Sequence, residues 1–164
     1  MENAAKFIAV TFLSFFLVAC GEDTAGTNTQ KQTEAKKSVN KVLSVTDFEY
    51  TLNDRPAVSV TVGADDHNYF GITFYRENVR AGYSVAESGH DLQEISMDGT
   101  WDKVLYVQSS KHPTRLNFSI VSITPEEAVI EVSAKLVNPS PERYFDLPKT
   151  RFSIQGEQLK HLLL

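Results

Sequence analysis

The residues whose types and spacing most suggest chemistry gather in one polar turn of the chain. Asp65, Asp66 and His67 are consecutive there, and His90 lies in an irregular stretch further along. If the two segments share one end of the fold, the carboxylate oxygens favour Ca²⁺, whereas an added imidazole favours Zn²⁺ or Cu²⁺. Asp-rich turns are also ordinary solvated hairpin ends, so the metal site stays one of two alternatives.

A second pattern resembles a nucleophile. Residues 82–86, Gly-Tyr-Ser-Val-Ala, approximate the nucleophile elbow of α/β-hydrolases, and Asp91 and His112 follow Ser84 in the chain order of that triad. The elbow requires a strand that feeds directly into a helix, and no helical pattern follows Ser84. We therefore expect Ser84 to be a loop hydroxyl and the protein not to be an enzyme.

Aromatic side chains offer a third kind of site. Trp101, Tyr83 and Tyr69 present the aromatic faces that sugar-binding β domains use. The alternative is that Trp101 plugs one end of the hydrophobic core, with Asp98 and Gly99 forming the turn that presents it. These three aromatic residues are the candidate ligand-binding residues of the sequence.

From Val42 onward, apolar side chains recur with a period of two, which is typical of strands. We therefore expect β-strands to position the candidate residues named above. Phe70, Ile72 and Phe74 share a face, and turn-forming segments such as residues 53–56 separate the runs. No amphipathic segment of helical period exceeds two turns. The sequence therefore predicts an all-β domain over residues 42–164, either an antiparallel, immunoglobulin-like sandwich or a small closed barrel.

Two segments depart from this pattern. Residues 79–101 have weak periodicity apart from an edge strand expected near residues 93–97, and long irregular connections tend to be functional or disordered. Residues 159–164 form an apolar tail, which we expect to pack on its own domain, the alternative being that it docks on another protein. A working surface is therefore expected first around residues 79–101, or at a strand edge that a partner extends.

The N-terminal segment is typical of a secretory leader. Residues 7–19 are apolar apart from two hydroxyl side chains, and they are too few for a helix to cross a hydrocarbon core of about 30 Å. The run closes on Leu17-Val18-Ala19-Cys20, which resembles the lipobox of bacterial lipoproteins. The resemblance implies cleavage after residue 19, acyl chains on Cys20 and, because Gly21 follows the cysteine instead of Asp, sorting to the outer membrane.

The segment after the lipobox is predicted to be a tether. Residues 21–38 contain no large apolar side chain, so residues 20–41 are expected to form a lipidated cysteine and a flexible connection to the domain. Acyl chains on Cys20 would anchor the protein in a membrane. No other cofactor is expected.

Charge narrows the choice of partner. The chain has 16 Lys and Arg against 21 Asp and Glu, a net charge of −5, whereas a nucleic-acid partner requires a basic face. The leading expectation is an outer-membrane lipoprotein facing the periplasm, whose domain binds another envelope protein as an assembly accessory, inhibitor or immunity factor. The alternative is a periplasmic lipoprotein that binds a glycan or a metal.

Overall fold

The structure, a computed structural model, describes residues 37–46, 51–89 and 93–164. The lipobox with Cys20, the tether up to residue 36, and the candidate residues His90 and Asp91 lie outside the described residues. Those that are described form ten strands, a short 3₁₀ helix and one α-helix. Their bounds are β1 Lys41–Thr46, β2 Thr51–Leu52, β3 Arg55–Asp65, β4 Asn68–Tyr75, η1 Arg76–Asn78, β5 Ser84–Ser88, β6 Ile95–Trp101, β7 Val104–Val107, β8 Arg115–Ile123, β9 Glu127–Pro139, β10 Glu142–Gln155 and α1 Gly156–Leu163.

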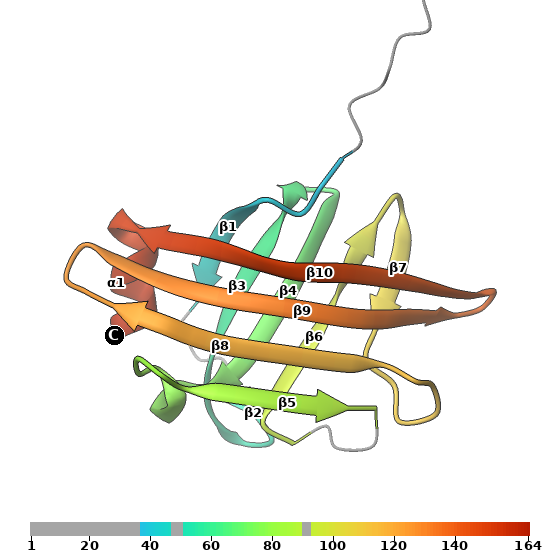
Figure 1. Ribbon diagram of the computed structural model, residues 1–164, viewed down its shortest axis with the longest axis horizontal. Coiled ribbons are helices and arrows are strands. Elements are labelled where there is room, and N and C mark those ends of the chain that lie inside the picture. Colours follow the sequence, from blue (N-terminus) through green and yellow to red (C-terminus); the bar gives the residue numbers. More distant parts are fainter. Residues whose placement is uncertain (1–36, 47–50, 90–92) are drawn as a thin grey trace, which may run out of the picture. The chain divides into compact units, whose positions relative to one another are not determined.

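The strands belong to one antiparallel sheet that curls into a half-barrel. The main path of the sheet runs β1-β3-β4-β6-β7-β9-β8-β5, with β10 on the other side of β9 and β2 paired with β3. The strands form two groups, one of β1, β2, β3, β4, β6 and β7 and the other of β5, β8, β9 and β10. A single residue pair, Val107 with Val137, joins the ladders of the two groups. Figure 1 shows β5, β8, β9 and β10 in front, crossing the strands behind them. The all-β prediction is confirmed, and the half-barrel is compatible with a sandwich or a small barrel.

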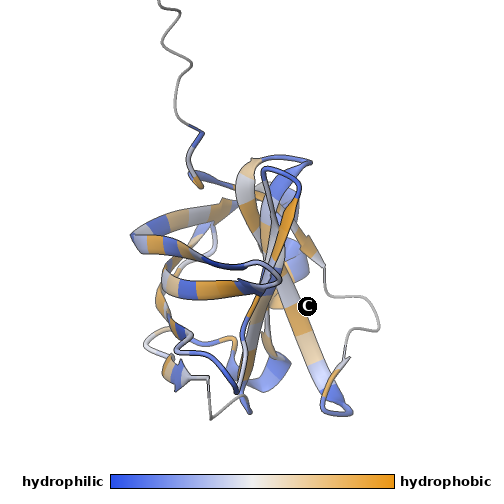
Figure 2. Cartoon of the chain, turned by 90° about the vertical axis from the view of Figure 1, so that its right-hand side faces the viewer, coloured by the Kyte–Doolittle hydropathy of each residue, from blue (hydrophilic) through white to orange (hydrophobic). Residues whose placement is uncertain are grey.

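The core lies on the concave side of this sheet. Val58, Val60 and Val62 of β3 are buried beside Phe74, Ile72 and Phe70 of β4, in the register that the alternating sequence predicts. The rings of Phe74 and Phe118 are 4.6 Å apart and join the two groups of strands. Figure 2 shows the alternation of hydrophobic and hydrophilic residues along the strands.

Two hairpins have the tight turns that match strand twist. Asn53 and Asp54 have φ angles of 50° and 60°, and Asp102 and Lys103 have 49° and 65°. Positive φ at both central residues is the mark of the type I′ turn. The first turn was expected from residues 53–56. The second corrects the expectation for Asp98 and Gly99, which lie inside β6.

The expectation that residues 79–101 are mostly irregular is wrong, because this segment contains β5 and the whole of β6. The strand expected near residues 93–97 exists as part of β6, but it lies between β4 and β7 instead of at an edge. Gly82 has a φ of 79° in the turn before β5, where the Tyr83 N–H donates to the Arg80 carbonyl at 3.2 Å. Gly99 of β6 is also required, because a Cβ there would lie 2.1 Å from the Tyr69 carbonyl oxygen. Gly82 and Gly99 weaken the strand pattern in the sequence, but the structure requires glycine at both positions.

The two ends of the described domain are tied to the sheet. Val39 is buried and the Asn40 N–H donates to the Gly63 carbonyl at 3.2 Å, so the fold begins before the expected residue 42. At the other end, Leu159 and Leu162 of α1 are buried, which confirms that the apolar tail packs on its own domain. None of the helices that the described residues form is long and apolar enough to span a membrane.

Candidate binding surface

The three candidate aromatic residues do not form one platform. Trp101, at the end of β6, is half-buried and stacks on Phe70 with their ring centroids 6.1 Å apart. Tyr83 is buried beside Glu94, which precedes the first residue of β6. Because β6 separates the two sites by roughly 20 Å at about 3.3 Å per residue, Trp101 and Tyr83 serve opposite ends of the core. Trp101 therefore occupies the core-plugging position that was the alternative.

Tyr83 is held in its neutral form. Its hydroxyl donates to Glu94 Oε2 at 3.2 Å. Burial, followed by the negative charge and the hydrogen bond of Glu94, raises the pKa of Tyr83 to about 12. The ring thus belongs to the structure of the β5 end of the molecule and is not offered to a ligand.

The acidic turn is organised by its own hydrogen bonds. Asp65 Oδ1 accepts the His67 N–H at 2.9 Å and Asn68 Nδ2 at 2.7 Å, and the Asn68 bond is the main cause that lowers the pKa of Asp65. His67 Nε2 lies 3.8 Å from Asp66 Oδ1, and both side chains are exposed. Within the described ranges no three His, Cys, Asp or Glu residues are placed to hold a metal ion. Asp65, Asp66 and His67 thus lie in a hairpin end that has its own hydrogen bonds, and His90, the fourth candidate residue, lies outside the described residues.

Asn68 joins two turns in a way that the sequence pattern did not reveal. It is 2% exposed, and its Oδ1 accepts the Asp102 N–H at 2.9 Å while its Nδ2 binds Asp65. The β3–β4 and β6–β7 turns consequently lie together around a surface hollow of about 540 Å³. Tyr69, at 37% exposed, lines this hollow together with Lys37.

The two described residues of the hydrolase-like pattern, Ser84 and His112, lie in different segments. Ser84 is the exposed first residue of β5, so a strand follows it, whereas a nucleophile elbow requires a helix there. His112 Nδ1 lies 2.8 Å from Ser109 Oγ in the loop between β7 and β8, and Asp91 is outside the described residues. The structure therefore places Ser84 on an open surface rather than in a nucleophile elbow.

That open surface is the edge of β5, the last strand of the main sheet path. Gly89 donates its N–H to the Thr114 carbonyl, and Tyr83 accepts the N–H of Ile120, both at 2.9 Å. Since hydrogen-bonded pairs alternate along an antiparallel ladder, Val85 and Glu87 face β8 with their backbone groups. The N–H and C=O groups of Ser84 and Ala86 consequently point away from the sheet, and both residues are exposed.

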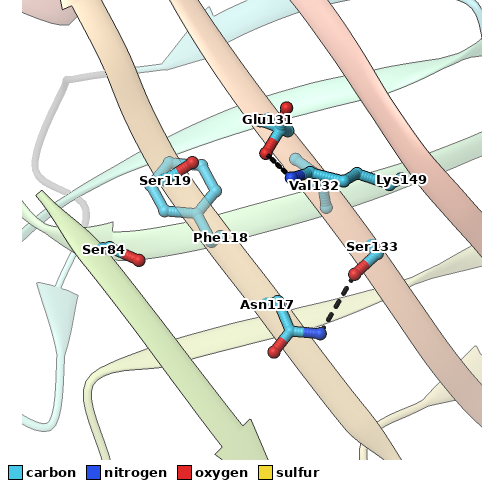
Figure 3. A pocket seen from close by; sticks show the side chains of 8 residues that line it. All are labelled: Ser84, Asn117, Phe118, Ser119, Glu131, Val132, Ser133 and Lys149. Atoms are coloured by element: carbon cyan, nitrogen blue, oxygen red, sulfur yellow. Dashed lines mark hydrogen bonds and ion pairs between the residues drawn. The ribbon is translucent and has the colours of Figure 1, made fainter. Parts of the chain in front are cut away.

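A shallow polar groove of about 280 Å³ borders the edge. Figure 3 shows its side chains from four strands: Ser84, Asn117, Phe118, Ser119, Glu131, Val132, Ser133 and Lys149. Glu131 binds Lys149 at 2.6 Å and Arg151 at 2.9 Å, and these two cations hold its pKa below the ordinary value. The groove presents hydroxyl and amide groups, with its carboxylate already paired.

The inner side of β5 is fixed by a buried carboxyl group, which no sequence motif singled out. Glu87 is 6% exposed, and its Oε1 accepts the backbone N–H groups of Gln93, Glu94 and Ile95 at 3.1, 2.6 and 3.2 Å. Its Oε2 is buried without a hydrogen-bond partner among the described residues. Glu87 therefore holds the start of β6 against β5.

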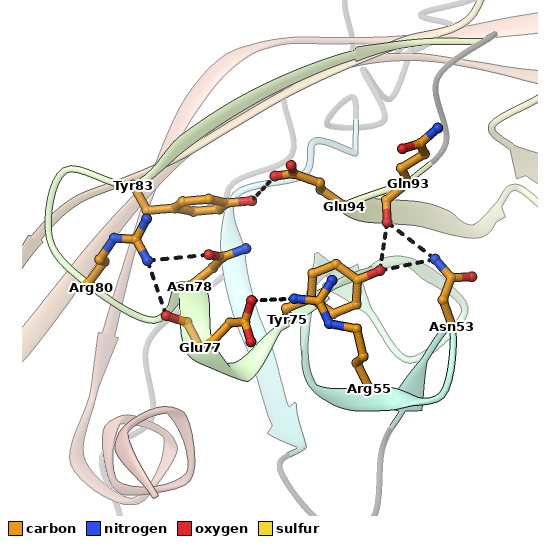
Figure 4. A network of polar contacts seen from close by, with 9 residues as sticks. All are labelled: Asn53, Arg55, Tyr75, Glu77, Asn78, Arg80, Tyr83, Gln93 and Glu94. Atoms are coloured by element: carbon orange, nitrogen blue, oxygen red, sulfur yellow. Dashed lines mark hydrogen bonds and ion pairs between the residues drawn. The ribbon is translucent and has the colours of Figure 1, made fainter.

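Further polar contacts support the same segment from the other side. The Tyr75 hydroxyl donates to the Gln93 carbonyl at 2.8 Å, and Asn53 Nδ2 reaches both groups (Figure 4). Arg55 lies over the Tyr75 ring with its Cζ 3.7 Å from the centroid, and it also binds Glu77. The backbone around residue 93 is thus held by polar side chains. The outward backbone groups of Ser84 and Ala86, by contrast, have no partner strand in the described sheet.

No protein-family model, no curated protein and no solved structure matches the chain.

Proposed function

We propose that the protein is an outer-membrane lipoprotein, anchored by acyl chains on Cys20, whose β domain binds another protein of the cell envelope. The lipobox residues Leu17-Val18-Ala19-Cys20 support the anchor, and Gly21 supports the outer-membrane address. In this proposal the domain acts by binding, without catalysis, and it faces the periplasm.

The observation that carries the binding proposal is the open edge of β5. Exposed edge strands are templates for another chain, and proteins guard them with lysine, proline, bulges or covering elements. The exposed positions of β5 from residue 84 to 88 are instead small: Ser84, Ala86 and Ser88. A partner strand that pairs with Ser84 and Ala86 would use backbone groups that the sheet leaves available.

The anchor is tested by the intact mass of the protein purified from bacterial membranes in detergent. The expected polypeptide begins at Cys20 and carries the added mass of acyl chains. The Cys20→Ala variant should retain its leader, lack the acyl mass and leave the outer-membrane fraction. An intact leader with an unmodified thiol in the native protein would refute the lipoprotein assignment.

The binding proposal is tested by a photoreactive amino acid introduced in living cells at Ala86. The expected result is a discrete adduct with one envelope protein, which then binds the purified domain directly. Leu163, 48% exposed at the opposite edge, is the matched position and should give no such adduct. If Ala86 gives no discrete adduct, or if Leu163 gives the same one, binding of an envelope protein at the β5 edge is refuted.

A second candidate function is glycan binding at the hollow between the β3–β4 and β6–β7 turns. The observation in its favour is the exposed ring of Tyr69 among charged and polar groups. Trp101 follows Thr100, which lines the hollow, so its fluorescence should change when peptidoglycan fragments bind. The Tyr69→Ala variant should lose that response and Tyr83→Phe should keep it. A flat titration of the unmodified protein would remove this candidate.

A further inference from the structure

We infer that the occupant of the β5 edge is an extended segment that adds to β5 as an antiparallel strand and carries acidic residues at its N-terminal end. The inference rests on the proposed function and names the chemistry of the partner. It follows from a basic corner, formed by Lys111 and Arg115, at the end of β5 where Ser88 lies.

The basic corner is positioned by the register of the sheet. Arg115 is the direct partner of Ser88 in the β5–β8 ladder. Lys111 and Arg115 line one hollow of about 520 Å³ together with Ser88 and His112. Both cationic residues are exposed. A strand added to β5 would therefore reach this hollow as it passes the position of Ser88.

The corner is fixed to the strand by a close backbone approach. A Cβ at Gly89 would lie 2.2 Å from the Ser109 carbonyl oxygen and 2.6 Å from that of His112. Thr114 Oγ1 donates to the Ser109 carbonyl at 3.1 Å, and its own carbonyl accepts the Gly89 N–H at 2.9 Å. The backbone that carries Lys111 and Arg115 is consequently held at a constant place relative to the β5 edge.

The charges of the corner have no counter-charge in the described part of the chain. Neither Lys111 nor Arg115 makes an ion pair there, whereas Lys149 and Arg151 on the neighbouring face share Glu131. This is notable in a protein whose net charge is −5. Charge complementarity thus favours carboxylates in the partner at this end of the strand.

Strand direction decides which end of the partner is acidic. β5 runs from Ser84 toward Ser88 and the basic corner. Every strand pair of the sheet is antiparallel, and antiparallel pairing is the slightly more stable arrangement. A partner running opposite to β5 begins at the corner, so its N-terminal residues meet Lys111 and Arg115.

The test uses two fluorescent seven-residue peptides and the full lipoprotein purified in detergent. One peptide is Asp-Asp-Thr-Val-Thr-Val-Thr, and the other has Lys-Lys in place of Asp-Asp. Anisotropy at low salt should show the acidic peptide binding about tenfold more tightly, and this preference should shrink as salt screens the charges.

Two matched pairs of variants locate the interaction. Lys111→Glu with Arg115→Glu should reverse the preference between the peptides. Lys41→Glu with Lys103→Glu makes the same charge change on β1 and in the β6–β7 turn, neither of which pairs with β5 or β8, and should preserve it. Ala86→Pro removes an outward N–H and should abolish binding of both peptides. Ala86→Val retains that N–H and should leave the binding in place.

Equal binding of the two peptides, or binding of neither, would overturn the inference. So would a dimer of the chain in sedimentation that Ala86→Pro dissociates, because the occupant would then be a second copy. The cell experiment separates this failure from that of the proposed function. If the Ala86 adduct persists with Lys111→Glu and Arg115→Glu, envelope binding stands and the acidic strand is refuted.

Discussion

The sheet has two borders that the fold treats in opposite ways. At β1 and β10 the C-terminal helix α1 covers the border, with Leu159 and Leu162 buried beneath it. Gln158 Nε2 donates to the Leu43 carbonyl at 3.1 Å and so satisfies a group of the β1 border. Arg76 donates to the Leu162 carbonyl at 2.8 Å and holds the end of the helix.

At β5 polar groups hold the border from inside, and among the described residues no strand pairs with its outer side. Glu87 and Tyr83 attach β5 to the start of β6, but neither covers the outward backbone of Ser84 and Ala86. The difference shows that stability does not require both borders to be sealed. The apolar helix α1 shields the β1 and β10 border from water. The buried carboxyl group of Glu87 instead fixes β5 from inside and leaves its outward N–H and C=O groups available.

The largest expected effect is on the sealed border. Leu162→Ala removes a fully buried side chain and should lower the free energy of unfolding by about 2–5 kcal/mol, because a cavity remains under α1. Leu163→Ala, at a 48% exposed neighbour, should change it by less than about 0.5 kcal/mol. Urea denaturation followed by circular dichroism measures both. Similar values for the two variants would mean that α1 does not seal the border.

Glu87→Ala tests the polar attachment of β5. It leaves the N–H groups of residues 93–95 without their acceptor and should lower the free energy of unfolding by about 1–3 kcal/mol. Glu87→Gln keeps an acceptor oxygen and should recover part of that loss in the same denaturation assay. Glu126→Ala, at an exposed glutamate, is the control and should be neutral. A neutral Glu87→Ala would show that β5 needs no such attachment.

Proline substitutions at adjacent positions test the direction of the β5 backbone groups. Val85→Pro removes an N–H that faces β8 and should cost about 1 kcal/mol or more of unfolding free energy. Ala86→Pro removes an N–H that faces outward and should cost less than about 0.5 kcal/mol, since edge strands tolerate proline there. Thermal melts of the two variants give the comparison. The reverse order would place the open edge at the wrong residues.

The smallest effect is a pH dependence from Tyr83. Because the fold raises the pKa of Tyr83 from 10.0 to about 12, the unfolded chain loses this proton first as the pH rises. The stabilisation is complete below pH 10 and is lost as the pH passes through about 12. Tyr83→Phe should therefore lose less stability between pH 9 and pH 11 than the unmodified protein or Tyr69→Phe. Identical pH profiles for all three would contradict a buried, neutral Tyr83.

Local patterns predicted the regular parts of the fold well. The alternation in β3, β4 and β8 marks which side chains are buried, because a strand has only two faces. The turn at Asn53 and Asp54 was also readable, since these residue types tolerate positive φ. β5 was not predicted because Glu87, a charged residue, points inward, and its backbone partners are identifiable only in three dimensions. The later part of β6 was not predicted because Asp98 and Gly99 were expected to form a turn.

The candidate site shows the same division. The type of Trp101 was compatible with either a sugar platform or a core plug, and its contact with Phe70 decides for the core position. The acidic residues 65–67 were compatible with a ligand set, but Asn68 and the local backbone use Asp65. Residue types name the chemistry that is available, and neighbours decide which of it is already used.

By itself, the sequence determined the strand-forming periodicity and the lipobox pattern, because both depend on residues close together in the chain. Only the tertiary structure decided which border of the sheet is closed. That decision requires contacts such as Gln158 with Leu43, 115 residues apart in sequence, and Glu87 with the start of β6. Whether a strand lies at the edge of a sheet depends on which other segments of the chain pair with it or cover it. The residues of β5 alone do not contain that information.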